Sequence, residues 1–397
     1  MDALAGSPLG WLCVGVTVLF GVAVLHLAKW SPSEQARMLV WSLLPAWLGL
    51  LCVAVLGDGG AGGGLAMLCA AALAVALASA ACRGSGAMLP VGDKAVLVTG
   101  SDTGIGHALA KYLDNLGFVV FAGVLNKDGP GAEELRRTCS QRLSLLQLDI
   151  TNPTQVKEAY LKVSDKVQNT GLWGVVNNAG VLGFPADGEL LPMSMYRQCM
   201  EVNFFGAVEV SKTFLPLLRK SQGRLVNMSS MAGGIPLRRY AAYGASKAAL
   251  SMFSGVMRQE LSDWGIKVAA IHPSGFRTGI LGTPELWDKQ EKELMENLPA
   301  DTRRDYGEDY LLGLKSYLLH VAAYCDADLS PVLSAILHAL LAKRPHGLYN
   351  PGKGAYVALC AFCYLPLWFY DFFVSKKPST ESVPRALRTS GAESKNL

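Results

Sequence analysis

The chain is poor in charged residues, and the first 82 positions have almost none. Asp, Glu, Lys and Arg make up 17% of the 397 residues, whereas hydrophobic residues make up 51%. This is more apolar than an ordinary soluble domain. The net charge of +4 is small and dispersed, with no basic stripe that could follow a phosphate backbone. We therefore expect no nucleic acid partner.

Paired cysteine motifs are also scarce. Cys360 and Cys363 form a CxxC pattern, but no second pair and no histidine lie near it. Zinc binding and redox chemistry are therefore not expected, and we predict no metal site. Most of the nine cysteines lie in apolar runs, which is typical of small buried side chains. We expect reduced thiols facing a cytosol-like compartment.

The N-terminus lacks the basic stretch that precedes the apolar core of a cleaved signal peptide. Three apolar runs follow, each close to the ~17 to 25 residues that cross a bilayer: about 8–27, 38–56 and 65–82. We predict a retained membrane anchor with two or three transmembrane helices in residues 1–82, then a linker in 83–93. The third run is rich in alanine, which contributes little to insertion, and flanking basic residues are too few to fix the orientation.

From Lys94 to Asn350, short apolar strands alternate with helical patterns. Strands are expected at residues 94–100, 118–125, 143–149, 173–180, 223–230, 266–273 and 346–350. Helices are expected at 106–117, 153–168, 241–264 and 330–344, and a long helix that ends near residue 211 is expected after the strand at 173–180. The strands are apolar on both faces, so helices must cover both sides of the sheet. This predicts an α/β fold with a doubly wound (Rossmann) parallel sheet.

Two segments depart from this alternation. Residues 279–329 are less regular and rich in leucine, tyrosine and charge, which favours a lid over a substrate; the alternative is a peripheral helical insertion. Residues 351–375 are aromatic and apolar but interrupted by Pro366 and Asp371, which indicates a membrane-surface segment rather than a spanning one. Residues 376–397 are polar and expected to form a flexible tail.

A glycine-rich turn, "TGSDTGIG" (99–106), joins the first strand to the first helix. Glycines at 100, 104 and 106 let the backbone approach a pyrophosphate closely, and the helix N-terminus supplies N–H donors. Asp149 and the "NNAG" stretch (177–180) end the third and fourth strands and border the same crevice. Each could be a simple turn residue, but together they predict a dinucleotide site.

The choice between NAD and NADP is less clear. An acidic residue at the end of the second strand selects the ribose of NAD, and basic residues there select the 2′-phosphate of NADP. Val124, Leu125 and Asn126 occupy that region, so neither signal is present. Thr103 in the glycine loop is also uncharged, and the residues alone lean only slightly toward NAD.

One of two nearby tyrosines has a lysine four residues later. Tyr243 and Lys247 would lie on the same face of a helix, whereas the corresponding partner of Tyr240 is Gly244. A lysine ammonium ~5 Å from a phenol, at an effective dielectric of ~20, favours the phenolate by ~3 kcal/mol, or ~2 pKa units. Tyr243 is therefore the predicted general base.

The spacing TGxxxGxG, together with NNAG and YxxxK, resembles the short-chain dehydrogenase/reductase family over about residues 94–350. "GLWGVVNNAGVLGFP" and "FLPLLRKSQGRLVNMSS" are similar to its membrane-bound hydroxysteroid and retinol dehydrogenase branch. The resemblance implies NAD as cofactor, with NADP less favoured. The predicted cofactor contacts are Gly100, Ser101, Asp102, Thr103, Gly104, Ile105, Gly106, Val124, Asp149, Ile150, Asn178, Ala179, Gly180, Tyr243, Lys247 and Thr278.

The resemblance also implies roles for single residues. Lys247 would hold the nicotinamide ribose, and Thr278 would meet the carboxamide. The family spacing selects Ser230 over Ser229 for hydrogen bonding to the substrate oxygen, so Ser230 and Tyr243 are the predicted substrate contacts. Asn203 matches an asparagine that holds a water behind the lysine, although alone it would be interpreted as a helix-kink residue. Ser274 replaces a glycine, which would be strained if that position has a positive φ.

The function that the resemblance implies is oxidation of hydroxysteroids by an integral protein of the endoplasmic reticulum membrane. The foremost reaction is that of a 17β-hydroxyl group to the ketone, as from estradiol to estrone or testosterone to androstenedione. Steroid and membrane lipid are the expected partners, and a homodimer is implied by the family alone. One alternative is a dehydrogenase of retinol, a hydroxy acid or another lipophilic secondary alcohol in the same branch. The other is a non-catalytic membrane scaffold, against which the intact catalytic set argues: Asn203, Ser230, Tyr243 and Lys247.

Overall fold

The computed structural model describes residues 87–374 and 383–388. The chain divides into two units, one of residues 91–340 and 348–397 and the other of residues 1–90 and 341–347. In the smaller unit Met88 pairs antiparallel with Ala342. The predicted membrane anchor in residues 1–82 and most of the predicted tail lie outside the described residues.

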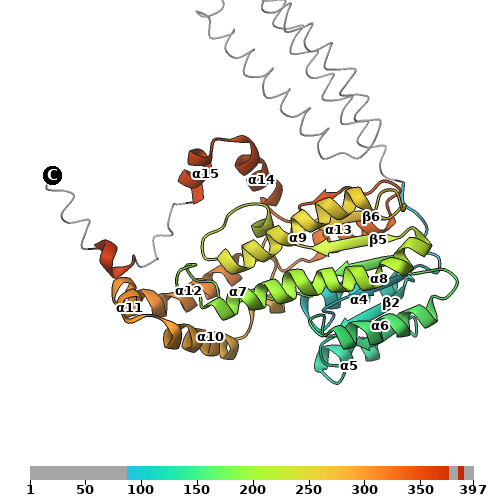
Figure 1. The fold of residues 1–397 in the computed structure, drawn as a ribbon, viewed down its shortest axis with the longest axis horizontal. Coiled ribbons are helices and arrows are strands. Elements are labelled where there is room, and N and C mark those ends of the chain that lie inside the picture. The colour runs from blue at the N-terminus through green and yellow to red at the C-terminus, as the bar shows by residue number, and fades with distance from the viewer. Residues whose placement is uncertain (1–86, 375–382, 389–397) are drawn as a thin grey trace, which may run out of the picture. The chain divides into compact units, whose positions relative to one another are not determined.

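The larger unit is built on a sheet of seven parallel strands in the order β3-β2-β1-β4-β5-β6-β7 (Figure 1). The strands are β1 (Ala95–Val98), β2 (Val119–Val124), β3 (Leu143–Gln147), β4 (Gly174–Asn177), β5 (Arg224–Met228), β6 (Lys267–Ile271) and β7 (Leu348–Tyr349). The strand order reverses between β1 and β4. The predicted doubly wound parallel sheet is confirmed, and its switch point lies at that pair.

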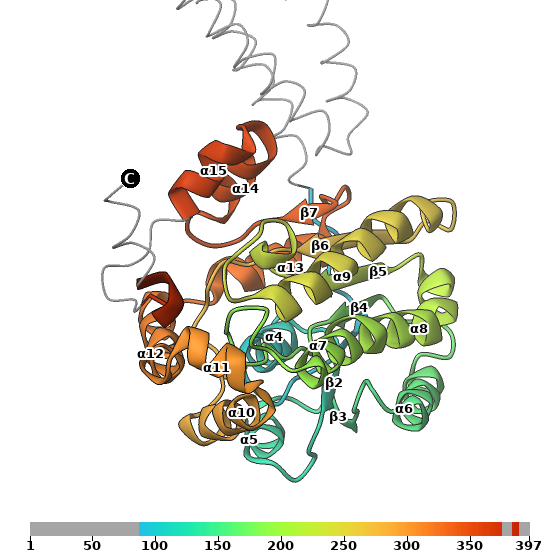
Figure 2. The same ribbon diagram turned by 60° about the vertical axis from the view of Figure 1, so that its left-hand side comes forward.

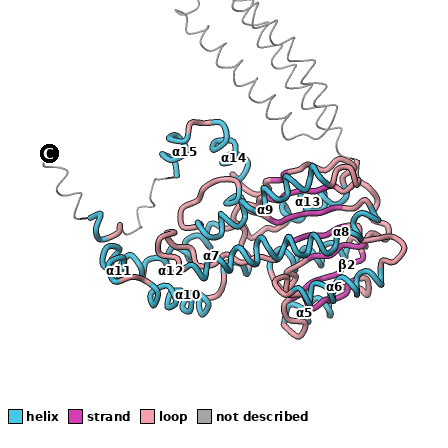
Figure 3. The backbone as a smooth tube through the Cα atoms, in the orientation of Figure 1, coloured by secondary structure: helices cyan, strands magenta, loops and turns pink. Residues whose placement is uncertain are grey.

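Helices fill the connections between the strands and continue beyond them (Figure 3). They are α4 (Gly104–Asn115), α5 (Pro130–Thr138), α6 (Pro153–Lys166), α7 (Met193–Met200), α8 (Ala207–Ser221), α9 (Ala241–Glu260), α10 (Pro284–Asn297), α11 (Ala300–Tyr306), α12 (Glu308–Tyr324), α13 (Ser330–Leu341), α14 (Ala355–Tyr364) and α15 (Leu367–Val374). A π-helix, η1 (Glu201–Gly206), joins α7 to α8. Two short 3₁₀ turns are η2 (Met231–Gly233) and η3 (Gly279–Leu281).

The core lies between the sheet and the helices on its faces. On the face toward the viewer in Figure 1, α6 and α8 pack against the strands through Val163, Phe214 and Leu218, which meet Leu97 and Val175. The central strands are buried along their whole length. Their apolar runs therefore form these strands because both faces are covered.

The structure differs from the sequence expectations in three connections. The helix expected to end near residue 211 continues to Ser221 despite Pro216 in its interior, because Phe214, Leu217 and Leu218 extend its buried face. Helix α5 was not expected; it is short and buries only Ala132 and Leu135. Residues 279–329 are mostly helical rather than irregular, and Thr283 caps α10 ahead of Pro284 at its first position.

The apolar C-terminal segment forms two short helices. One side of α14 and α15 packs into a small core through Leu359 and Tyr370, while Val357, Trp368 and Phe372 are exposed. Within residues 87–374 and 383–388, no helix has the length and apolar character to cross a bilayer.

A buried polar network links the central strands to the helices that cover them. The Asn177 amide donates to Asn227 Oδ1 and to Ser211 Oγ at 2.8 Å each, and the Asn227 amide donates to Ser254 Oγ at 2.8 Å. Asn227 begins a formal Asn-Met-Ser glycosylation sequon, but it is fully buried in β5 and cannot carry a glycan.

Substitution Asn227→Ala should destabilise the larger unit by about 2 kcal/mol, because it leaves the amide of Asn177 and the hydroxyl of Ser254 buried with fewer partners. Urea denaturation of the purified full chain, followed by tryptophan fluorescence, measures the loss. Exposed Asn297→Ala on α10 is the control and should stay within about 0.5 kcal/mol of wild type. Equal stability of Asn227→Ala and wild type would contradict the structural role of the network.

Candidate active site

The glycine loop lies at the carboxyl end of β1, and two of its glycines have a positive φ. Gly100 has φ 66° and Gly104 has φ 61°, a region that side chains with a Cβ rarely adopt. A Cβ on Gly100 would lie 2.7 Å from the Ala179 Cα. The loop can therefore follow this path only with glycine at that position.

Hydrogen bonds fasten the glycine loop to the loop after β4. The Asn178 amide donates to the carbonyl groups of Thr99 at 2.9 Å and Gly100 at 3.1 Å. In return, Thr99 Oγ1 accepts from the backbone N–H groups of Asn178 and Ala179, both at 3.0 Å. Sequence reasoning identified Asn178 as a cofactor contact but missed Thr99, which positions both loops.

A cavity of about 470 Å³ opens along the carboxyl ends of the strands. Thirteen of the sixteen predicted cofactor residues line it: Gly100, Asp102, Thr103, Gly104, Ile105, Asp149, Ile150, Asn178, Ala179, Gly180, Tyr243, Lys247 and Thr278. Leu125, Thr151 and Gln198 also line it, although sequence reasoning did not select them. Their side chains are common loop and helix residues that carry no motif.

The other three predicted cofactor residues face the protein interior. Ser101 is buried and its hydroxyl donates to the Val98 carbonyl at 3.1 Å. Val124 is fully buried in β2. Gly106 is needed for packing rather than for contact, because a Cβ there would lie 2.2 Å from the Gly100 carbonyl oxygen and 2.3 Å from the Asn178 amide nitrogen.

The Asp102 carboxylate reaches from the glycine loop to the end of β2. It accepts hydrogen bonds from the backbone N–H of Leu125 at 2.9 and 3.0 Å and from that of Asn126 at 3.2 Å. The end of β2 has no acidic residue of its own, as the sequence indicated. Asp102 thus brings a negative charge to the position where one was expected and not found.

Tyr243 and Lys247 project from α9 and both line the cavity. The Lys247 Nζ lies 5.8 Å from the centroid of the Tyr243 ring and donates to the Met228 carbonyl at 2.8 Å. Burial raises the pKa of Tyr243 to about 12, and the hydrogen bond with Ser230 opposes this rise. Burial lowers the pKa of Lys247 to about 8. The sequence argument predicted a lowered pKa for Tyr243; in the protein alone the desolvation of the hydroxyl dominates and raises that pKa.

Ser230 and Ser229 face in different directions. Ser230 lines the cavity, and its Oγ accepts from the Ala232 N–H at 3.2 Å. The Ser229 hydroxyl is directed at the Lys247 carbonyl at 2.9 Å and lies 2.8 Å from Ser251 Oγ. Both serines border the cavity, but the Ser229 hydroxyl is engaged by Lys247 and Ser251 of α9, which leaves Ser230 as the serine available beside Tyr243.

Asn203 lies in the π-helix η1 and does not line the cavity. Its side-chain amide forms two hydrogen bonds of 2.8 Å with the backbone of Val181: the Oδ1 accepts from the N–H, and the Nδ2 donates to the carbonyl. The Nδ2 also donates to Ser246 Oγ at 2.9 Å. A Cβ on Gly180 would lie 3.0 Å from Asn203 Oδ1 and 3.2 Å from Lys247 Nζ. Asn203 thus marks a helix irregularity behind the lysine, and its water-holding role stays a prediction.

The loop after β6 completes the rim. Thr278 lines the cavity and lies against the glycine loop, since a Cβ on Gly104 would be 3.0 Å from the Thr278 Cβ. Among the described residues other than glycine, only Gln222 and Arg239 have a positive φ. Ser274 therefore does not carry the backbone strain that its replacement of a glycine suggested.

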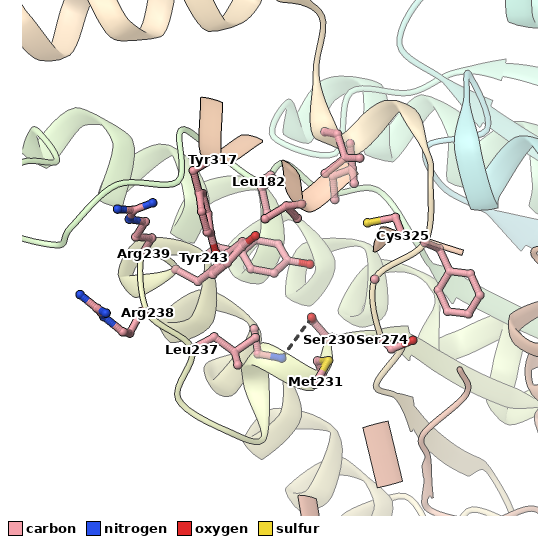
Figure 4. Close-up of a pocket in the computed structure, with 17 residues that line it drawn as sticks. Leu182, Ser230, Met231, Leu237, Arg238, Arg239, Tyr243, Ser274, Tyr317 and Cys325 are labelled. Atoms are coloured by element: carbon pink, nitrogen blue, oxygen red, sulfur yellow. Dashed lines mark hydrogen bonds between the residues drawn. The ribbon is translucent and has the colours of Figure 1, made fainter. Parts of the chain in front are cut away.

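Figure 4 shows a second cavity, of about 460 Å³. It shares Ser230, Tyr243, Ser274, Phe276 and Ile280 with the first. Its lining is mainly apolar and aromatic and includes Leu182, Met231, Leu237, Phe276, Val321 and Tyr317. Both volumes are in the range of about 300 to 1,000 Å³ that is typical of small-molecule sites. The arrangement places the hydroxyl groups of Ser230 and Tyr243 between a polar crevice and an apolar chamber.

Residues 94–289 match the family model described as short chain dehydrogenase. The chain is 53% identical over 390 residues to 17-beta-hydroxysteroid dehydrogenase type 2 of Homo sapiens, and the match covers 96% of each chain. It is 46% identical over 300 residues to 11-beta-hydroxysteroid dehydrogenase type 2 of Bos taurus, covering 76% of this chain and 74% of the relative.

Two solved short chain dehydrogenases share the fold. One, from Burkholderia phymatum in complex with NAD, has a TM-score of 0.57 and 17% identity and covers 75% of this chain and all of the other. The second, from Burkholderia cenocepacia in complex with NADP, has a TM-score of 0.54 and 22% identity and covers 73% of this chain and all of the other. At these identities the likeness concerns the fold alone.

Substitution Gly106→Ala should lower the affinity for a nicotinamide dinucleotide at least about ten-fold, because the new Cβ would displace the Gly100 carbonyl and the Asn178 amide. Fluorescence titration with the reduced dinucleotide measures this. Gly255→Ala on α9, where a Cβ meets nothing within 4 Å, is the control and should bind as wild type. Unchanged affinity in Gly106→Ala would show that the close packing of Gly106 on Gly100 and Asn178 is not needed for dinucleotide binding.

Proposed function

The chain belongs to the short chain dehydrogenase family, and on this premise we propose that it oxidises hydroxysteroids with NAD, foremost a 17β-hydroxyl group to the ketone. The observation that carries the proposal is the meeting of the polar and the apolar cavity at Ser230 and Tyr243. Oxidation of an alcohol needs a cofactor crevice and a substrate chamber that share one proton-accepting group.

The residues present fit a nicotinamide dinucleotide. Gly100 and Gly104 line the cavity and leave room for the pyrophosphate at the N-terminus of α4, while Gly106 lets the loop pack beneath them. Lys247 and Thr278 line the cavity where the nicotinamide end would be held. When bound, the oxidised cofactor accepts a hydride from the carbinol carbon. All other chemistry is the task of the chain's own residues.

Tyr243 takes the hydroxyl proton while Ser230 donates a hydrogen bond to the substrate oxygen. Because burial raises the pKa of Tyr243 to about 12, the tyrosine is protonated at neutral pH in the protein alone. The positive charges of Lys247 and of the oxidised nicotinamide both favour its phenolate and thus lower that pKa. Lys247 therefore acts on the base, and Ser230 acts on the substrate.

Asp102 supports NAD as the cofactor. Its carboxylate lies at the end of β2, where it can accept hydrogen bonds from ribose hydroxyl groups and would repel a 2′-phosphate. No side chain of lysine or arginine lines the cavity at this end, within the part of the chain that the structure describes; Lys247 stands at the other.

The apolar chamber and the relatives' names support a steroid. The chamber is lined mainly by aliphatic and aromatic side chains, with Arg238 and Arg239 as its charged residues, and this suits a rigid lipophilic alcohol. The relative with 96% coverage is named for the 17β position, and the more distant one for the 11β position. The 17β-hydroxyl is therefore the first substrate to test.

The sequence and the C-terminal helices support a membrane location. The three apolar runs in residues 1–82 support an integral protein of the endoplasmic reticulum membrane. Exposed Val357, Leu367, Trp368 and Phe372 on α14 and α15 support contact with lipid at the membrane surface. Residues 354–370 carry no charge and are followed by Lys376 and Lys377, which suit anionic headgroups.

A homodimer through α8 and α9 belongs to the same proposal. Phe205 at the end of η1 and Met252 and Val256 on α9 are large exposed apolar side chains. Phe204 and Phe253 extend this apolar surface through an edge-to-face ring contact. Such a face supports pairing of two copies.

Membranes that contain the full chain should convert estradiol to estrone with NAD, more slowly with NADP, and Tyr243→Phe should lower the rate by at least about 10². Product analysis by chromatography measures this, with all-trans-retinol and an 11β-hydroxysteroid in parallel. Turnover of retinol without steroid would move the function to that substrate class. No turnover of any of them would favour the scaffold alternative.

Substitution Asp102→Asn should raise the ratio of kcat/KM with NADP to that with NAD about ten-fold, because it removes the charge that repels the 2′-phosphate while keeping one oxygen for the Leu125 N–H. Steady-state rates with each cofactor at constant steroid measure the ratio. Asp128→Asn, an exposed carboxylate outside the cavity, is the control. An unchanged ratio in Asp102→Asn would remove Asp102 from cofactor selection.

A further inference from the structure

Arg239 is a buried cation in the loop between η2 and α9. Its side chain is 8% exposed, and its φ of 69° is in the left-handed region that residues other than glycine rarely adopt. The adjacent Arg238 is exposed. A strained backbone conformation persists only where the surrounding contacts hold it, and such residues cluster at functional sites. The contacts of Arg239 therefore point to a functional role.

Those contacts are made with the helix α12. The Arg239 guanidinium lies 4.4 Å from the centroid of the Tyr317 ring and 5.7 Å from that of Tyr310, and it donates to the Tyr310 hydroxyl at 3.3 Å. Tyr310, 3% exposed, in turn donates to the carboxylate of Asp187. Asp187 lies in the loop after β4, so three segments meet at one buried positive charge.

This cluster adjoins the substrate chamber and the catalytic tyrosine. Tyr317 lines the chamber, and its side chain shares a hydrogen bond with that of Tyr240. The Tyr240 ring packs edge to face on the Tyr243 ring, with centroids 6.3 Å apart. Figure 4 shows the guanidinium groups of Arg238 and Arg239 pointing away from Ser230. Arg239 therefore borders the chamber at a distance from the reacting groups and meets Tyr317 there.

We propose that Arg239 is a positioning residue that fastens α12 over the substrate chamber through Tyr310 and Tyr317, and thereby sets the affinity for the lipophilic substrate. The effect on steroid affinity rests on the proposed function, whereas the fastening of α12 does not. The apolar contacts of α12, through Leu311 and Leu314 on Phe184 and Leu190, hold the helix near the domain. The contacts of Arg239 with Tyr310 and Tyr317 fix the part of α12 that borders the chamber.

Limited trypsin digestion of the full chain in detergent tests the fastening without any substrate. Residues 279–329 contain exposed basic residues, among them Arg303 and Arg304. Arg239→Met should accelerate cleavage in this segment about ten-fold, as mapped by mass spectrometry, because cleavage follows local opening. Arg238→Met is the matched control, since Arg238 forms no hydrogen bond or ring contact with α12 in the part of the chain that the structure describes. Equal cleavage in both variants and wild type would overturn the proposal.

Steady-state kinetics tests the consequence for substrate. Arg239→Met should raise KM for estradiol about ten-fold while kcat and KM for NAD stay within about two-fold, because Arg239 touches neither reacting atoms nor the cofactor cavity. Arg239→Lys, which keeps the charge but not the planar group, should fall between. A loss in kcat and NAD affinity equal to the change in KM would indicate a general structural role and overturn the proposal.

Two further variants keep the test decisive if Arg239→Met folds poorly. Tyr310→Phe retains the ring but removes the hydroxyl that joins Arg239 to Asp187, and should raise KM for estradiol about three-fold with kcat unchanged. Arg239→Gly relieves the backbone strain but also removes the cation, and should resemble Arg239→Met. Wild-type behaviour of both variants would refute the fastening. Absence of steroid turnover in wild type, with accelerated cleavage in Arg239→Met, would refute only the steroid substrate.

Discussion

The active site depends on the hydrogen bonds that join β1 to β4 at their carboxyl ends. The sheet order reverses between these two strands, so their loops diverge to opposite faces and leave a crevice. Four hydrogen bonds among Thr99, Gly100, Asn178 and Ala179 hold the divergent loops together at its base. The close approach requires Gly100, and the same amide of Asn178 requires Gly106. The cofactor crevice therefore arises from the reversal of the strand order, and these hydrogen bonds hold its base in place.

Burial governs the electrostatics of Tyr243 and Lys247, the proposed catalytic pair. A lysine near a tyrosine lowers the pKa of the phenol when both are solvated, but here removal of water raises the pKa of Tyr243 and lowers that of Lys247. Both shifts disfavour charge in the protein alone. The positive charge of an oxidised nicotinamide would favour the phenolate, since little water screens it there. Under the proposed function, that charge and the ammonium of Lys247 would both favour proton acceptance by Tyr243.

The sheet and the motif residues could be predicted from sequence because each carries a local signal. Buried β-branched runs define the strands, and a four-residue step places Tyr243 beside Lys247. Contacts over long sequence distances have no such signal. Asp102 reaches the end of β2 because the loop folds back, Arg239 meets Tyr310 across 71 residues, and Thr99 binds residues almost 80 positions away. The helices of residues 279–329 had local signals, such as Thr283 before Pro284, but their low hydrophobic regularity concealed them.

The loop of residues 231–240 connects three functions that the sequence presents separately. Ile235 and Leu237 pack with Leu359 and Tyr370 of the C-terminal helices, and the Tyr370 hydroxyl donates to the Pro236 carbonyl at 2.8 Å. The same loop lines the substrate chamber through Met231 and Leu237 and meets α12 through Arg239. On the proposed membrane location, α14 and α15 would rest on lipid, where a steroid is concentrated. A displacement of those helices would then reach the chamber wall through one short loop. Arg239, near the other end of this loop, attaches it to α12. Arrival of substrate from the membrane and fastening of the chamber would then both act on residues 231–240.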